Sequence, residues 1–147
     1  MIFWETKNVS RFLPAMLAVM LCGCGPNLPH TSAVGGKVTF RGKPLTNGTV
    51  MFEPVSAVAG QPWRPAVAEL QSDGTYRLST FRAGDGVMPN EYRVTIHSYV
   101  SGPTEDNPTA PYVWRIPERY GKADKSGLRF TGPVGARSPL NFDIDIP

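Results

Sequence analysis

The stretch EYRVTIH, residues 91–97, is the clearest strand signal in the chain. Apolar and polar side chains alternate through it with a period of two, which places them on opposite faces of an extended backbone. The apolar face holds Tyr92, Val94 and Ile96, and the polar face holds Arg93, Thr95 and His97. A strand with one polar face is expected in an antiparallel sheet that has one side in water.

The same alternation recurs in six other short segments before and after residues 91–97. Their apolar positions are Val38 and Phe40; Val50 and Phe52; Ala66, Ala68 and Leu70; Tyr76 and Leu78; Leu128 and Phe130; and Leu140, Phe142, Ile144 and Ile146. Glycine-bearing turns such as SDG, residues 72–74, separate the segments. Seven such strands predict an all-β fold, a seven-stranded antiparallel β-sandwich over residues 34–147. We expect residues 101–125 to be irregular, apart from one helical turn near residues 117–120.

The composition agrees with this fold and disfavours one class of function. The 147 residues include 15 glycines and 15 prolines, which interrupt helices but suit short strands joined by turns. The formal net charge is +3, and the basic residues are scattered along the chain. Because nucleic-acid binding requires clustered lysines and arginines, we expect no nucleic-acid partner.

The amino terminus has the pattern of an export signal. Lys7 and Arg11 precede the ten-residue apolar run FLPAMLAVML, residues 12–21. A membrane-spanning helix needs about 20 apolar residues, whereas the apolar part of a signal peptide has about 7–15. The alternative, a buried core helix, is disfavoured by Pro14 and by the charged start. We therefore predict a removable signal peptide at residues 1–23.

The sequence LCGC, residues 21–24, resembles the lipobox of bacterial lipoproteins, although Cys22 stands where alanine or serine is more usual. The resemblance implies that the Cys24 thiol takes a diacylglyceryl group, that cleavage follows Gly23, and that the new amine is often acylated. Two or more acyl chains would hold the protein firmly on a membrane, since each buried CH₂ contributes about 0.8 kcal/mol. We expect an exported protein of the cell envelope, and Gly25, in place of an inner-membrane retention Asp, favours the outer membrane.

The two cysteines leave no free thiol in the mature chain, because Cys22 departs with the signal and Cys24 becomes a thioether. A strained disulfide or a partial metal site would be the alternatives for this pair, but both lack partners elsewhere in the sequence. We expect no cofactor apart from the covalent lipid. Residues 24–33, rich in Gly, Pro, Asn and Ser, predict a flexible tether that includes His30.

Four segments, taken in order, resemble the small bacterial lipoproteins that carry a carboxypeptidase-regulatory-like domain, a transthyretin-like (prealbumin-like) sandwich. They are VGGKVTFRGKPL (34–45) with GTVMF (48–52), DGTYRLST (73–80), DGVMPNEYRVTI (85–96), and IPERY (116–120) with SGL (126–128). The family usually has glycine before the Glu-Tyr pair, and this chain has Asn90, which tolerates left-handed backbone. The resemblance implies an adhesive or accessory β-domain and brings no catalytic residues.

Two arrangements of residues are candidates for a catalytic centre. Nucleophilic hydrolysis needs a base beside the nucleophile, but His30 belongs to the tether and His97 to the polar face of a strand. Asp143 and Asp145 share one strand face at a spacing of about 6.6 Å, which would suit glycoside hydrolysis. A solvated strand face explains the pair more simply. We therefore expect a protein that is not an enzyme.

Four further acidic residues occupy turns and were considered as calcium ligands. A calcium loop needs regularly spaced oxygen ligands, and the sequence shows no such loop. Turn formation is the favoured explanation. The four are Asp73, Asp85, Glu105 and Asp106.

Aromatic residues of the loops are the candidate contact surface: Trp63, Tyr112, Trp114 and Tyr120. Exposed rings stack on sugars or bury into a protein partner, although rings at these positions would also serve to cover the open end of the sandwich. We expect a lipid-anchored, non-catalytic envelope module that binds another envelope protein or takes part in a surface assembly.

Two rival functions make different structural demands. A carbohydrate-binding module requires at least two of the loop aromatics to be exposed and coplanar. A small hydrolase requires a cleft in which two carboxylates, or His97, converge away from water.

Overall fold

The structure, a computed structural model, describes residues 28–135 and 139–147. The predicted signal peptide, Cys24 and the first part of the tether lie outside the described residues. Within them, no helix is both long enough and apolar enough to cross a membrane.

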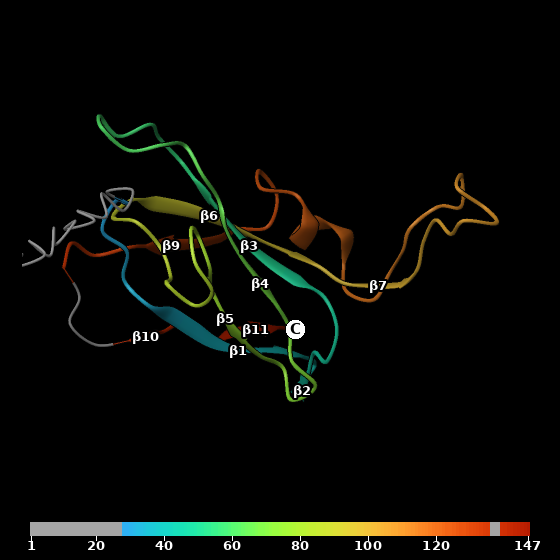
Figure 1. Ribbon diagram of the computed structural model, residues 1–147. Coiled ribbons are helices and arrows are strands. Elements are labelled where there is room, and N and C mark those ends of the chain that lie inside the picture. The colour runs from blue at the N-terminus through green and yellow to red at the C-terminus, as the bar shows by residue number, and fades with distance from the viewer. Residues whose placement is uncertain (1–27, 136–138) are drawn as a thin grey trace, which may run out of the picture.

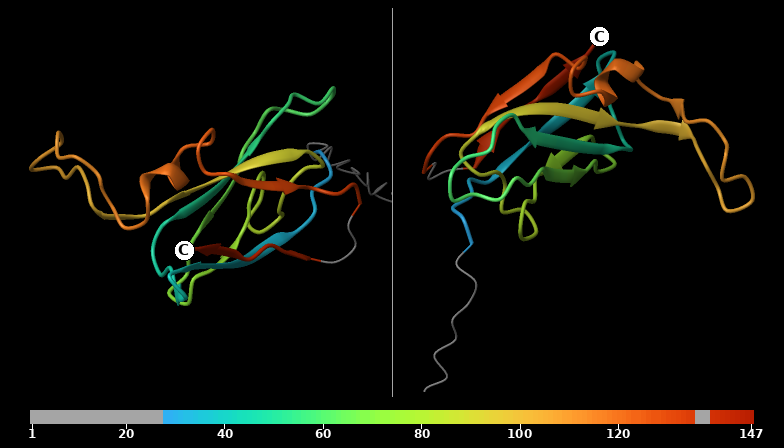
Figure 2. Two further views of the ribbon diagram at one scale, coloured as in Figure 1. Left: turned by 180° about the vertical axis from the view of Figure 1, so that it is seen from behind. Right: turned by 90° about the horizontal axis from the view of Figure 1, so that it is seen from above.

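Two sheets face each other, and a two-stranded ribbon extends from one end of the pair (Figures 1 and 2). In the first sheet β1 (Val34–Phe40) pairs with β10 (Leu140–Asn141) and β11 (Ile144–Ile146), and with β5 (Thr75–Arg77) and β2 (Lys43–Pro44). The second sheet has the order β4 (Ala66–Glu69), β3 (Thr49–Pro54), β6 (Glu91–His97), β9 (Leu128–Thr131). The ribbon pairs β7 (Tyr99–Ser101) with β8 (Val113–Trp114), and the 3₁₀ helix η1 spans Glu118–Gly121.

The all-β sandwich predicted from the sequence is confirmed, and each of the seven alternating segments contributes at least one strand. In β3 the residues Val50 and Phe52 are buried while their neighbours are half-buried. In β6 the predicted apolar face, Tyr92, Val94 and Ile96, is buried. The period-two pattern therefore identified the face of the second sheet that packs inward.

The two sheets meet around Phe52, whose side chain is fully buried. Its ring centroid lies 6.4 Å from that of Tyr76, 6.1 Å from Tyr92, 5.3 Å from Phe130 and 5.8 Å from Phe142. These separations are those of tilted and edge-to-face aromatic pairs. Because the five rings come from both sheets, this cluster joins the two layers.

The pairing of β1 with β10 and β11 is parallel, which differs from the antiparallel sheets predicted. Parallel neighbours need a long crossover, and here almost the whole domain lies between β1 and the last strands. The last predicted strand, residues 140–146, is divided into β10 and β11. Between them, the amide of Lys37 donates to the Asp143 carboxylate at 2.8 Å instead of to a backbone carbonyl. Gly36 allows this close approach, since a Cβ there would lie 2.1 Å from the carbonyl oxygen of Phe142.

A second difference concerns residues 101–125, which the sequence analysis expected to be irregular apart from one helical turn. The turn is present as η1, but β8 lies inside this stretch and pairs with β7. Strands of two and three residues are too short to give a periodic signal, which explains why the ribbon was not predicted.

The end of the predicted tether is already part of the sandwich. The amide of Ser32 donates to the carbonyl of Val87 at 2.8 Å, and the amide of Val87 donates to Ser32 at 2.9 Å. Gly86 has φ of +88°, and a Cβ there would lie 1.8 Å from the Ser32 carbonyl oxygen, so the contact requires glycine. The tether therefore joins the sandwich at Ser32, one residue before its predicted end.

The sandwich has two distinct ends, set by the antiparallel register of β3 and β6. Pro54 lies opposite Tyr92 at one end, and Thr49 lies opposite His97 at the other. The first is the tether end, where Asn90 also hydrogen-bonds to the loop of residues 55–65. The second is the arm end, from which residues 99–114 leave the sandwich (Figure 2). We call these residues the arm.

Candidate functional site

The arm continues from β6 and extends well beyond both sheets (Figures 1 and 2). Its two strands pair Tyr99 with Trp114 and Ser101 with Val113, with an irregularity between Tyr99 and Ser101. Residues 102–112 connect the two strands. The pairing places the side chains of Tyr99 and Trp114 on the same face of the ribbon.

Trp114 secures the base of the arm. It is half-buried and packs against the hydrophobic core. Its ring centroid lies 5.9 Å from that of His97 and 4.6 Å from that of Tyr99. On η1, a Cβ added to Gly121 would lie 2.1 Å from the Trp114 ring, so this ring rests directly on the glycine backbone.

Further out, Tyr99 and Tyr112 continue the row of rings. Their centroids are 4.5 Å apart with an interplanar angle of 37°. Tyr112 is 56% exposed, and its ring lies against Gly102 on the facing side of the loop. The row of aromatic rings therefore runs from the core to the solvent along one face of the arm.

The arm also carries exposed aliphatic side chains. Val100 is 61% exposed and Val113 is 49% exposed. Val113 comes between Tyr112 and Trp114, which directs its side chain to the face opposite theirs. Val100 lies at the irregularity between Tyr99 and Ser101. Soluble monomers rarely expose a large contiguous apolar surface that has no binding role, and the arm exposes apolar side chains on both of its faces.

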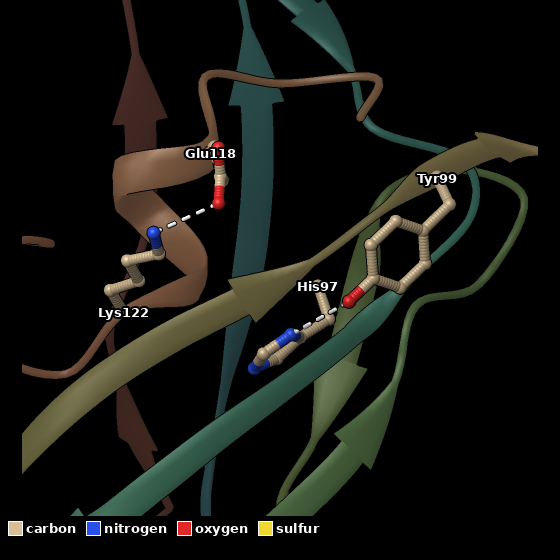
Figure 3. A network of polar contacts seen from close by, with 4 residues as sticks. All are labelled: His97, Tyr99, Glu118 and Lys122. Carbon is tan, nitrogen blue, oxygen red and sulfur yellow. Dashed lines mark hydrogen bonds and ion pairs between the residues drawn. The ribbon is translucent and has the colours of Figure 1, made fainter. Parts of the chain in front are cut away.

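Polar contacts hold the base of the arm in place (Figure 3). Nδ1 of His97 and the hydroxyl of Tyr99 lie 3.1 Å apart, within hydrogen-bonding distance. Burial, together with the neighbouring Tyr112, raises the pKa of Tyr99. The Tyr99 hydroxyl therefore stays protonated at neutral pH and is available as a donor to the His97 ring.

The short helix beneath Trp114 has an ion pair on its exposed side. Nζ of Lys122 lies 2.9 Å from a carboxylate oxygen of Glu118, four residues earlier (Figure 3). This hydrogen bond and the charge of Glu118 raise the pKa of Lys122. The pair spans the single turn on which the Trp114 ring rests.

The four loop aromatics predicted as a contact surface do not gather in one place. Tyr112 and Trp114 lie together on the arm, whereas Trp63, 61% exposed, belongs to the loop after Pro54 at the tether end. Tyr120 is buried, and its hydroxyl accepts a hydrogen bond from Arg119 at 2.8 Å. The four candidates therefore lie in three separate places: two on the arm, one in a distant loop and one in the core.

Two rings that pack beside Trp114, those of His97 and Tyr99, were not predicted as part of a contact surface. His97 was noted as a residue of the polar strand face, but its role beside Trp114 was not foreseen. The alternation of residues 93, 95 and 97 continues to Tyr99, and this was the signal that would have found it.

The arm rings do not form the flat platform that the carbohydrate-binding alternative requires. Tyr99 is tilted by 37° against Tyr112 and by 56° against Trp114. Trp114 is half-buried, which leaves Tyr112 as the most exposed ring of the row.

The paired carboxylates considered for hydrolysis are engaged in strand pairing. Asp143 accepts a hydrogen bond from the Lys37 amide, and Asp145 accepts one from the Thr39 hydroxyl at 2.5 Å. Both residues are exposed along β1. Their hydrogen bonds hold the parallel strands β10 and β11 in register with β1.

Two of the acidic turn residues cap turns, as predicted. Asp73 accepts hydrogen bonds from the amide and the hydroxyl of Thr75, at 2.9 and 2.7 Å, and these bonds lower its pKa. The Asp85 carboxylate accepts from the amides of Thr80, Phe81 and Arg82.

The other two turn acids, Glu105 and Asp106, are exposed near the tip of the arm, and His30 is exposed near the start of the described chain. Across residues 28–135 and 139–147, no three His, Cys, Asp or Glu side chains are grouped so that they could hold a metal ion.

Comparison with known proteins gives little further guidance. No family model matches the chain, and no curated protein matches it. Among solved structures it is similar to the crystal structure of a 9R-lipoxygenase from Cyanothece PCC8801, with 14% identity and a TM-score of 0.41. That match covers 80% of this chain, which spans 17% of the lipoxygenase chain.

Proposed function

We propose that this protein is a lipid-anchored, non-catalytic module of the bacterial cell envelope that binds another envelope protein, or assembles at the surface, through its arm. The observation that carries the proposal is the position of the arm. Its exposed apolar side chains, Val100, Tyr112 and Val113, project from the end of the sandwich opposite the tether.

Lipidation of Cys24 would place the membrane at the tether end. Cys24 and Ser32 would then be at most about 29 Å apart, and Ser32 is fixed in the sandwich. The arm would point away from that membrane, toward other components of the envelope. The lipobox-like sequence and the export signal support this placement, with the outer membrane favoured by Gly25.

A non-catalytic role is supported by what the candidate catalytic groups do. The His97 ring contacts the Tyr99 hydroxyl and packs beside Trp114. Asp143 and Asp145 hold β1 through hydrogen bonds. Each of these groups has a structural role that does not call for a substrate.

Site-specific photocrosslinking in intact cells tests the contact surface. The full chain would carry a photoreactive residue at Val113 on the arm, or at Val134 as the control. Val134 is 87% exposed and follows β9, whose Thr131 pairs with Glu91 near the tether end. We expect discrete protein adducts from position 113 and none from position 134.

Adducts of equal yield at both positions would contradict a role for the arm. A carbohydrate-binding function would give a different result, namely retention of the chain on immobilised envelope glycan that is lost with Tyr112→Ala. Tyr112 is the residue to test because it is the most exposed ring of the row.

The anchor has its own test. Cys24→Ser should remove the acyl chains from the amino terminus, as measured by mass spectrometry, and release the protein from the membrane fraction. Cys22→Ser is the matched control, because serine is usual at that position in the lipobox, and it should leave the lipid in place. The anchor would be contradicted if Cys24→Ser stayed in the membrane fraction like Cys22→Ser and the protein still began at Met1.

A further inference from the structure

A cleft of about 320 Å³ opens where the hairpin of β1 and β2 meets the base of the arm. Its apolar lining comes from Phe40, Pro44 and Leu45. Its charged lining comes from Arg41, Lys43 and Arg115. The cleft thus combines an apolar wall with three positive side chains, drawn from two segments far apart in the sequence.

The side chains that line the cleft carry three positive charges. None of the residues that line it is acidic. In the part of the chain that the structure describes, the ion pair present is that of Lys122 with Glu118, so Arg41, Lys43 and Arg115 have no carboxylate within 4.0 Å. Three cations that share one cleft repel one another, and a bound anion would turn this repulsion into attraction.

The backbone at Arg41 provides an independent observation. Arg41 has φ of +52° and is the one non-glycine residue with positive φ among residues 28–135 and 139–147. It forms the two-residue hairpin turn with Gly42, whose φ is +73°. Such turns favour Asn-Gly, because asparagine tolerates this backbone better than arginine does.

Packing holds the side chain of Arg41 at the cleft. Its guanidinium carbon lies 5.0 Å from the centroid of the Phe40 ring, which lines the same cleft. A cation over an aromatic face is restrained in position. The turn therefore carries a long cationic side chain on a strained backbone, in a cleft that Lys43 and Arg115 also line.

We propose that this cleft binds a phosphate or sulfate ester. The tetrahedral oxyanion lies among Arg41, Lys43 and Arg115, because guanidinium groups bind such oxygens through paired N–H donors. The organic body of the ester packs on Phe40 and Leu45. The volume is at the lower end of the range for ligand pockets, so the ligand is small. This site does not depend on the proposed protein contact of the arm.

The position of the cleft indicates the source of the ligand. β1 begins next to the tether end at Val34 and rises over about 20 Å to Phe40 at the cleft. Lipid headgroups of the membrane that holds the anchor would therefore lie at the other end of the molecule. The ester is expected on a soluble molecule or on an envelope polymer.

Titration of the full chain in detergent micelles with inorganic phosphate and with sulfate, followed by amide chemical shifts, tests the site. Saturable shifts are expected for residues 40–43, 45, 46 and 115, with no saturable change when sodium chloride is added to the same ionic strength. Shifts that chloride reproduces, or that spread over all exposed lysines and arginines, would overturn the proposal.

Arg41→Asn is the decisive variant. It removes one cation and gives the turn a residue that suits its backbone, so the chain should bind phosphate at least tenfold more weakly while its melting temperature stays the same or rises. Arg64→Gln is the control, because Arg64 lies over Phe81 outside the cleft and should leave the affinity unchanged. Unchanged affinity in Arg41→Asn would refute the site.

Vesicles of phosphatidylglycerol, compared with vesicles of phosphatidylcholine, separate the two sources of phosphate. The proposal predicts that free phosphate shifts the cleft signals and that neither vesicle does so when the chain is anchored in it. A response to phosphatidylglycerol without a response to free phosphate would show a lipid site and contradict the proposal.

Discussion

The core and the arm each hold a cluster of aromatic rings at similar separations, but the surroundings of the two clusters differ. Around Phe52 the centroids lie 5.3–6.4 Å apart, and in the row formed by His97 and the arm rings they lie 4.5–6.4 Å apart. Phe52 is fully buried between two sheets, whereas Tyr112 is 56% exposed on a ribbon that no second layer covers. Ring contacts alone add about 0.5–1.5 kcal/mol per pair, so burial determines which cluster stabilises the fold.

The largest effect is expected from disrupting the core cluster. Phe52→Ala removes the ring that joins both sheets and leaves a cavity, which should lower the free energy of unfolding by about 3–5 kcal/mol. Urea denaturation of the purified chain measures this change. A loss below about 1 kcal/mol would mean that the core can close over the missing ring. The Phe52 cluster would then stabilise the fold no more than the exposed arm does.

A second test uses the core tyrosines. Burial raises the pKa of Tyr92 to about 12, and burial with the nearby charge of Asp143 raises that of Tyr76. Tyrosines of the unfolded chain ionise near pH 10. The neutral side chains therefore contribute stability that is complete below about pH 10 and is lost as the pH rises beyond it.

The measurement is the free energy of unfolding as a function of alkaline pH, together with tyrosinate absorbance. Stability should fall above about pH 10, and the fall should be shallower in Tyr92→Phe. Ionisation of all the tyrosines near pH 10 in a chain that is still folded would show that the rings around Phe52 are open to water.

A smaller change in stability is expected at Thr95, on the face of the second sheet that points away from Phe52. Thr95 is 1% exposed, and within the described residues its hydroxyl has no hydrogen-bond partner. An unpartnered buried hydroxyl is costly, so Thr95→Val should raise the free energy of unfolding by about 1 kcal/mol. Thr39→Val is the matched control, because that hydroxyl donates to Asp145 and its removal should destabilise. A loss of stability in Thr95→Val would indicate a water or other partner at this hydroxyl.

The sequence predicted the body of the sandwich well because its strands bury every second side chain. β3 and β6 are of this kind, with Val50, Phe52, Val94 and Ile96 buried as expected. The sequence did not predict the parallel pairing of β1 with β11. The alternation of apolar side chains along a strand shows which face is buried and not which strand lies beside it. The Lys37 amide bond to Asp143 is a contact across 106 residues, which no local pattern encodes.

The candidate site was predicted less well. The position of an aromatic residue in a loop indicates neither the end of the sandwich to which the loop belongs nor the exposure of the ring. Trp63 and Tyr112 therefore looked equivalent in the sequence, although the register of β3 and β6 places their loops at opposite ends. Tyr120 looked exposed, but η1 turns it into the core.

The most direct test of the central claim, that the core carries stability and the arm carries contact, is the free energy of unfolding of a chain in which Val100, Tyr112 and Val113 are all replaced by threonine. These side chains are 61%, 56% and 49% exposed, and exposed substitutions change stability by about 0.5 kcal/mol or less each. The account predicts a value within about 1.5 kcal/mol of the parent chain. A loss of about 3 kcal/mol or more, comparable with that of Phe52→Ala, would contradict it, because the apolar arm would then be part of the folding core.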